Sequence, residues 1–191
     1  MLIQRIFIAI NLPEEAKDHL ERLQNGLGIQ FQDKIVKWVN RDNMHLTLAF
    51  MGGILEKDLP KVLEICSQII PQFEQFDLQL TQTEYGPPKH FPPKLVWIKA
   101  ESDSLMELQK QLQGALNKNG FKLEDREFTP HLTLGRINTM EFRNIDPETK
   151  PDVDVHAELD FIVQSVEVMR SELKKAGAEY EVIESYPLKQ L

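Results

Sequence analysis

Two of the five histidines in this chain of 191 residues head the same tetrapeptide, His-Leu-Thr-Leu. It occurs at residues 45–48 and again at residues 131–134. Side chains in a strand alternate between its two faces, so each histidine shares a face with the threonine two residues later, roughly 6–7 Å away. The leucines then anchor each strand to a core, and the imidazole and hydroxyl stand together on the opposite face.

Two such strands facing each other across a cleft would place His45 and His131 on either side of one phosphate. Phosphodiester cleavage needs one group that takes a proton from the attacking oxygen and another that protonates the leaving oxygen. Imidazole, with an ordinary pKa of about 6.5, suits both tasks. Thr47 and Thr133 can donate hydrogen bonds to the non-bridging oxygens. The alternative for either motif alone is an amphipathic strand with a surface histidine, and the repetition favours chemistry.

Arg136 closely follows the second motif, and its guanidinium could clamp a phosphate or the nucleotide beside it. Gly135 permits a bulge that re-aims the next side chain. A solvated or ion-paired arginine at a strand end is the alternative. This chemistry needs no metal or other cofactor, and His45 and His131 lack carboxylate or cysteine partners at recognisable ligand spacing.

The other histidines carry weaker signals. His19 on the polar side of a helix and His156 after a charged segment are expected to be solvated, and His90 lies in a proline-rich loop at a possible cleft rim. Strand aromatics are usually core residues, although three of them could stack on a base: Phe7, Trp38 and Trp97.

The composition is that of a soluble globular protein, with 41% hydrophobic and 27% charged residues. A formal net charge of −8 argues against a protein that coats long nucleic acid, but it allows a small positive pocket. The single cysteine, Cys66, falls in an apolar helical pattern and is expected to be a buried core thiol. No apolar run approaches the roughly 20 residues that span a bilayer, so a reduced, cytoplasmic protein is expected.

The hydrophobic pattern predicts strands and helices that alternate around the two motifs, in an α+β layout. Residues 1–191 are expected to form one two-lobed domain, in which each half offers a strand, a helix and a His-Leu-Thr-Leu strand. Gly52-Gly53 is expected to end the first motif strand. The C-terminal stretch is expected to form two long strands that turn near Gly177. Strands are predicted at 5–12, 35–39, 45–50, 76–86, 95–100 and 128–136, helices from 13, 59 and 105, and loops at 86–94 and 138–155.

The paired motifs resemble the HxTx motifs of the two-histidine phosphoesterase superfamily. The segments RIFIAINLP, WVNRDNMHLTLAFMGG, FTPHLTLGR and MRSEL…GAEYEVIESYPL are most similar to RNA 2',3'-cyclic phosphodiesterases of the 2'-5' RNA ligase family. The resemblance covers essentially the whole chain. It implies a bilobal fold in which antiparallel sheets with outer helices surround a central cleft.

The resemblance also implies an activity: hydrolysis of 2',3'-cyclic phosphate ends of RNA to 2'-phosphate ends, with minor reversible 2'-5' joining. His45 then matches the proton donor to the 3' oxygen and His131 the base that activates water. Thr47, Thr133 and Arg136 match phosphate-holding groups. The expected partners are RNA ends rather than long duplexes or membranes, and the expected state is a monomer. A non-catalytic nucleotide- or RNA-end-binding module and an enzyme for another small cyclic phosphate remain the alternatives.

Overall fold

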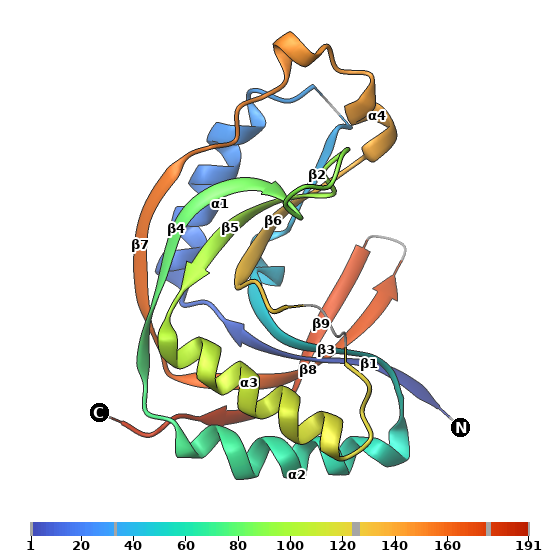
Figure 1. Cartoon of the computed structure of the whole chain (residues 1–191), viewed down its shortest axis with the longest axis vertical. Helices are drawn as coiled ribbons and strands as arrows, with labels where there is room; N and C mark the ends of the chain where they lie inside the picture. Colours follow the sequence, from blue (N-terminus) through green and yellow to red (C-terminus); the bar gives the residue numbers. More distant parts are fainter. Residues whose placement is uncertain (1, 33, 124–126, 175–176, 191) are drawn as a thin grey trace.

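Antiparallel strands are the main regular elements of this computed structural model, which describes residues 2–32, 34–123, 127–174 and 177–190 (Figure 1). The strands are β1 (Ile3–Asn11), β2 (Val36–Trp38), β3 (His45–Leu55), β4 (Phe76–Gly86), β5 (Leu95–Glu101), β6 (His131–Ile137), β7 (His156–Val163), β8 (Ser165–Lys174) and β9 (Gly177–Pro187). The helices are α1 (Glu14–Gly28), α2 (Leu59–Ile69), α3 (Asp103–Lys118) and α4 (Thr139–Arg143), with short 3-10 turns between some elements.

The strands follow one path in the order β7-β4-β5-β6-β3-β1-β8-β9, and β2 pairs with the other part of β6. β6 and β3 belong to different halves of this path and pair at Leu46 and Leu132. Each half therefore ends on one of the His-Leu-Thr-Leu strands, and the two lobes meet along them. This is the expected α+β architecture of antiparallel sheets with outer helices.

The helices bind the two halves into one unit. α1 follows β1 in the chain but lies against the other half, next to β7, whereas α3 follows β5 and packs against β3 and α2 (Figure 1). One continuous hydrophobic core results, and Leu46 and Leu132 are both fully buried in it. The first leucine of each motif thus anchors its strand as the alternation predicts.

Three expectations about the elements were wrong. β3 does not end at Gly52-Gly53, because Gly52, at φ +66°, serves an irregularity in the pairing with β1 and the strand continues to Leu55. The segment 138–155, expected to be a loop, contains α4, whose Phe142 is buried against Tyr85.

The C-terminal stretch forms three strands rather than two, since β7 pairs with β4 in one half and β8 with β1 in the other. The apolar alternation shifts phase between Val163 and Val166, but no glycine or proline marks the break at Gln164, so the stretch resembles a single strand. The turn expected near Gly177 includes residues 175 and 176, which lie outside the described residues.

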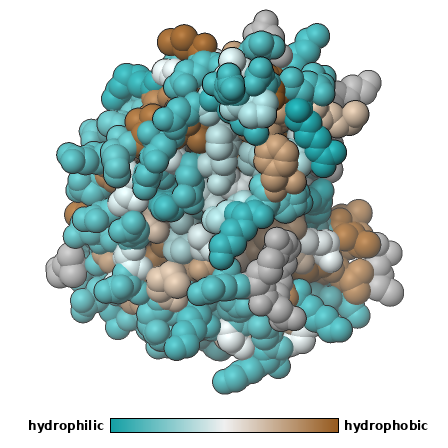
Figure 2. All heavy atoms as spheres, turned by 45° about the horizontal axis from the view of Figure 1, so that its top comes forward, coloured by the Kyte–Doolittle hydropathy of each residue, from teal (hydrophilic) through white to brown (hydrophobic). Residues whose placement is uncertain are grey.

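No helix in the described ranges is long and apolar enough to cross a membrane. Hydrophilic side chains dominate the face shown in Figure 2, and the hydrophobic ones form small separate patches.

Candidate active site

A cleft of about 540 Å³ lies where β3 and β6 meet, and both His-Leu-Thr-Leu motifs line it. The five side chains that the sequence singles out come together there: His45, Thr47, His131, Thr133 and Arg136. They are separated by up to 91 residues in the chain, so the fold, rather than local sequence, unites them.

The antiparallel pairing of β3 with β6 arranges the four motif side chains as corners of one group. Because Leu46 pairs with Leu132, His45 stands opposite Thr133, and Thr47 stands opposite His131. Each imidazole therefore has one hydroxyl beside it on its own strand and another across from it. A phosphate among them would meet the two histidines from different sides.

The two imidazoles are held in the same way. Nδ1 of His45 lies 2.8 Å from the backbone oxygen of Asn43, and Nδ1 of His131 lies 2.7 Å from that of Thr129. A carbonyl oxygen can only accept, so each Nδ1 carries the hydrogen and donates it. In both neutral rings Nε2 is then the nitrogen with a lone pair, available for proton transfer.

Aromatic side chains pack against both histidines. Phe7 lies 4.9 Å from the His45 ring and Tyr180 lies 5.1 Å from it, between ring centroids. Trp97 lies 4.1 Å from the His131 ring. Phe7 and Trp97 are only 2% and 4% exposed, so they support the imidazoles and are not free to stack on a base. Trp38 differs, because it is partly exposed and lines the cleft.

Burial lowers the pKa of His45 and of His131. Desolvation is the main cause for both, and the hydrogen bond to the backbone carbonyl opposes it. The nearby positive charge of Arg136 lowers the pKa of His45 further. The protein groups of the cleft therefore favour neutral imidazoles, and an anion bound between them would favour a protonated one.

A bulge explains why Arg136 reaches this cleft. Simple alternation from His131 would place Arg136 on the leucine face. β5, however, pairs Trp97 with Thr133 and Val96 with Gly135, so Leu134 is an extra residue on β6. The extra residue reverses the alternation, and Arg136 returns to the side of the histidine, in keeping with the role expected of Gly135.

β3 contains the same irregularity at the equivalent place. β1 pairs Ala9 with Thr47 and Ile8 with Ala49, so Leu48 is the extra residue. Phe50 follows His45 by five residues, as Arg136 follows His131, and it is 47% exposed. β3 and β6 thus contain the same bulge, which is followed by the aromatic side chain of Phe50 in β3 and by the cation Arg136 in β6.

Two buried glutamines support these bulges. Gln24 of α1 donates from Nε2 to the Leu134 oxygen at 2.8 Å, and Gln109 of α3 donates to the Leu48 oxygen at 3.5 Å. Both side chains are more than nine-tenths buried. Sequence reasoning missed them, although each occupies a core-facing position in an otherwise apolar helical stripe, and such a polar residue in a stripe is a signal.

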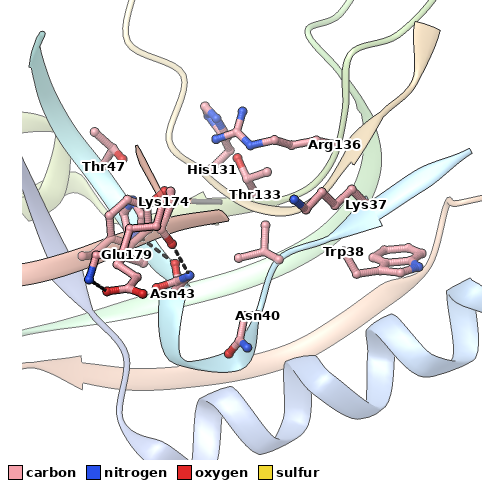
Figure 3. A pocket seen from close by; sticks show the side chains of 14 residues that line it. Lys37, Trp38, Asn40, Asn43, Thr47, His131, Thr133, Arg136, Lys174 and Glu179 are labelled. Carbon is pink, nitrogen blue, oxygen red and sulfur yellow. Dashed lines mark hydrogen bonds and ion pairs between the residues drawn. The ribbon is translucent and has the colours of Figure 1, made fainter. Parts of the chain in front are cut away.

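Lys37 adds a second cation beside Arg136. The two are directly paired across β2 and β6, and both extend toward Thr133 and His131 (Figure 3). Neither forms an ion pair within the part of the chain that the structure describes. Unpaired cations side by side in a protein of net charge −8 mark a place for bound anions.

The end of the β8–β9 hairpin closes the cleft near His45. The Asn43 side chain donates to the Ala178 backbone oxygen at 3.0 Å, and Lys174 forms an ion pair with Glu179 (Figure 3). Tyr180 from the same hairpin packs edge-on against the His45 ring. This contribution could not be located from sequence, because it depends on long-range pairing.

Other residues that the sequence raised lie elsewhere. The lining of the cleft does not include His19, His90 or His156. Cys66 is fully buried, as expected, and burial raises the pKa of its thiol to about 12. In the described residues no three or more His, Cys, Asp or Glu side chains are grouped so that they could hold a metal ion.

The chain is similar to known proteins over almost its whole length. Two proteins named RNA 2',3'-cyclic phosphodiesterase match almost end to end. That of Methanocaldococcus jannaschii is 29% identical, covering 95% of this chain and 99% of its own length. That of Methanothermobacter thermautotrophicus is 30% identical, covering 96% and 98%.

Solved structures share the fold. TT0787 of Thermus thermophilus is 28% identical with a TM-score of 0.83, covering 97% of this chain and 98% of its own. LigT of E. coli in its apo form is 22% identical with a TM-score of 0.79, covering all of both chains. The sequence pattern of the family described as LigT like Phosphoesterase matches twice, at residues 10–97 and 98–180, with one motif in each match. This chain therefore belongs to the LigT-like phosphoesterase family.

Proposed function

We propose that this protein hydrolyses the 2',3'-cyclic phosphate at an RNA 3' end and leaves a 2'-phosphate. One observation carries the proposal: two imidazoles, each with Nδ1 committed to a backbone carbonyl, lie at diagonally opposite corners of the group that they form with Thr47 and Thr133 in one cleft. The name shared by the two archaeal relatives supports RNA as the substrate. We expect the enzyme to act as a monomer in the cytoplasm, on strand ends rather than long duplexes.

In this reaction His131 and His45 divide the proton transfers. Nε2 of neutral His131 takes a proton from water as the water oxygen attacks phosphorus opposite O3'. Protonated His45 gives its Nε2 proton to O3' as the P–O3' bond breaks, and the phosphate remains on O2'. The division follows the family resemblance, since the hydrogen bonds of the two rings are alike.

The other cleft side chains hold the phosphate. The hydroxyls of Thr47 and Thr133 are not hydrogen-bonded within the described residues, so both can donate to the non-bridging oxygens. Arg136 offsets the negative charge as it builds up in the transition state. All the proton transfers are thereby assigned to side chains of the chain itself, and none requires a metal ion.

The test uses an RNA oligonucleotide that ends in a 2',3'-cyclic phosphate, with a chelator present. His45→Ala and His131→Ala should each lower kcat by about 10²–10⁴-fold, the range for loss of a general acid or base. His156→Ala, which changes an exposed histidine outside the cleft, should retain the wild-type rate. Circular dichroism of every variant checks that the fold is intact.

Three results would contradict the proposal. Wild-type turnover in either cleft variant would remove the histidine pair from the mechanism, and loss of activity on chelation would point to a metal. A 3'-phosphate product would mean that the P–O2' bond breaks instead of the P–O3' bond. Tight binding without any product would instead favour the non-catalytic binding module, and faster turnover of small cyclic nucleotides than of RNA ends would favour the other alternative.

A further inference from the structure

The Trp97 indole lies directly against the imidazole of His131, with ring centroids 4.1 Å apart and ring planes tilted by 39°. The pairing of β5 with β6 produces this contact, because Trp97 stands opposite Thr133 and Lys99 stands opposite His131. The indole is only 4% exposed, so water screens the contact little. The face of an indole carries partial negative charge and therefore attracts an imidazolium more strongly than a neutral imidazole.

Glu84 of β4 holds the indole in this position. It is the cross-strand neighbour of Trp97, and its Oε1 accepts a hydrogen bond from the indole N–H at 2.9 Å. Its Oε2 forms an ion pair with Lys99 at 2.9 Å, so both oxygens of the carboxylate are engaged. The indole cannot turn away from His131 without breaking its bond to this fixed carboxylate.

The rings around His45 provide a weaker counterpart. The Phe7 ring lies farther from the imidazole, at 4.9 Å between centroids, and the Tyr180 ring meets it edge-on. A benzene ring also attracts a cation less strongly than an indole does. The charge of Arg136 lowers the pKa of His45, whereas burial is what lowers the pKa of His131. The surroundings of the two rings thus favour a positive charge on His131 over one on His45.

We propose that Trp97 and Glu84 suit His131 to act as the base: the indole face stabilises the imidazolium that forms when His131 accepts a proton, and Glu84 positions the indole. The role of His131 as the base rests on the proposed function, whereas the stabilisation of its charged form does not. Because burial lowers the pKa of His131, the ring is neutral before the reaction. The indole then acts on the charge that develops as water attacks.

Other charged groups also face His131. The charge of Lys99 is balanced by Glu84, and Glu127 lies in a smaller pocket that His131 also lines. Two cations form the cationic end of the cleft and one further titratable ring completes it: Lys37, Arg136 and His45 (Figure 3). All of these groups stay in place when Trp97 is replaced, so a comparison of Trp97 variants isolates the effect of the indole.

An NMR titration of the imidazoles in the free protein tests the effect of the indole. The Cε1–H signal of His131, assigned with His131→Ala, is followed against pH in the wild type, Trp97→Phe and Trp97→Leu. The pKa of His131 should fall by about 0.5–1 in Trp97→Leu, and by less in Trp97→Phe, which keeps an aromatic ring. An indole that only fills space predicts the opposite sign, because a smaller side chain admits water and relieves the desolvation that lowers this pKa.

Glu84→Ala and Glu84→Gln test the positioning role. Both variants remove the same charge, but only glutamine keeps an acceptor for the indole N–H. The pKa of His131 should fall in Glu84→Ala and stay close to the wild-type value in Glu84→Gln. His156, which is exposed and outside the cleft, is the reference and should titrate alike in every variant.

An unchanged or higher pKa of His131 in Trp97→Leu would overturn the inference. If that variant does not fold, an unchanged pKa in both Trp97→Phe and Glu84→Ala would overturn it. Equal falls in the two Glu84 variants would remove the positioning role, because the lost charge alone would explain them. Turnover of a cyclic-phosphate RNA is measured in the same proteins: absence of 2'-phosphate from the wild type would refute the proposed function, and full kcat in a variant with a lowered pKa of His131 would refute the contribution of the indole to the base.

Discussion

Replacing Thr133 with valine removes one hydroxyl from the cleft and keeps a β-branched side chain of similar shape. Within the described residues this hydroxyl has no hydrogen-bonding partner, so its removal leaves no protein group unsatisfied. The loss should therefore fall on the bound phosphate. A hydrogen bond to a charged group contributes about 1.5–3 kcal/mol, which corresponds to a fall in kcat/KM of roughly 10- to 150-fold. The melting temperature should hardly change.

The assay measures kcat/KM on a cyclic-phosphate oligonucleotide for Thr133→Val, Thr47→Val and the double variant. If the two hydroxyls hold different phosphate oxygens, the double variant should lose about the product of the single effects. Thr81→Val is the matched control, because Thr81 lies on β4 and bonds to Glu101 outside the cleft. A well-folded Thr133→Val enzyme within threefold of the wild type would refute this account, as would an equal loss in the control.

The remaining predictions concern the cationic end. Arg136→Gln should raise the pKa of His45, since the guanidinium disfavours its protonated form, and the alkaline limb of the profile of kcat/KM against pH should move to higher pH. No movement would contradict the proximity of the two charges. Lys37→Ala should raise KM for oligonucleotides more than for a cyclic mononucleotide, and should reduce the slope of log KM against log salt by roughly 0.7, measured by salt titration. An equal effect on both substrates would contradict a contact with a second phosphate. Gly135→Ala should destabilise the protein by about 1–3 kcal/mol in urea denaturation, because its Cβ would lie 2.5 Å from a β2 side chain. An unchanged free energy of unfolding would mean that β2 shifts to make room for the new methyl group at no cost.

The cleft side chains of the two motifs could be predicted because their signal is local and repeated. A histidine and a threonine two residues apart share a strand face whatever the rest of the fold, and two identical copies suggest one shared site. The family resemblance supplied only the assignment of His45 as the acid and His131 as the base. Arg136 could be predicted as a cleft residue only because Gly135 suggested a bulge. Simple alternation would have placed the Arg136 side chain in the core.

The supports of the site depend on contacts between distant segments. Gln24 is 110 residues from the carbonyl that it holds, and Tyr180 meets His45 only after β8 and β9 have formed. Hydrophobic alternation shifts phase between Val163 and Val166, where β7 gives way to β8, but it specifies which face a side chain takes and not which neighbour its strand pairs with. The predicted duplication of the halves stays a prediction, although each half matches the family pattern.

The near symmetry of the two motifs raises the question of what gives the reaction a direction. Each strand supplies a histidine held through Nδ1, a threonine hydroxyl without a partner among the described residues and a bulge supported by a buried glutamine. None of these features distinguishes the acid from the base. One difference lies five residues beyond each histidine, where one strand has the cation Arg136 and the other has the half-exposed aromatic ring of Phe50. If His45 protonates the leaving oxygen, as proposed, the RNA strand that carries this oxygen lies at the cationic end, where Arg136 can hold its phosphates.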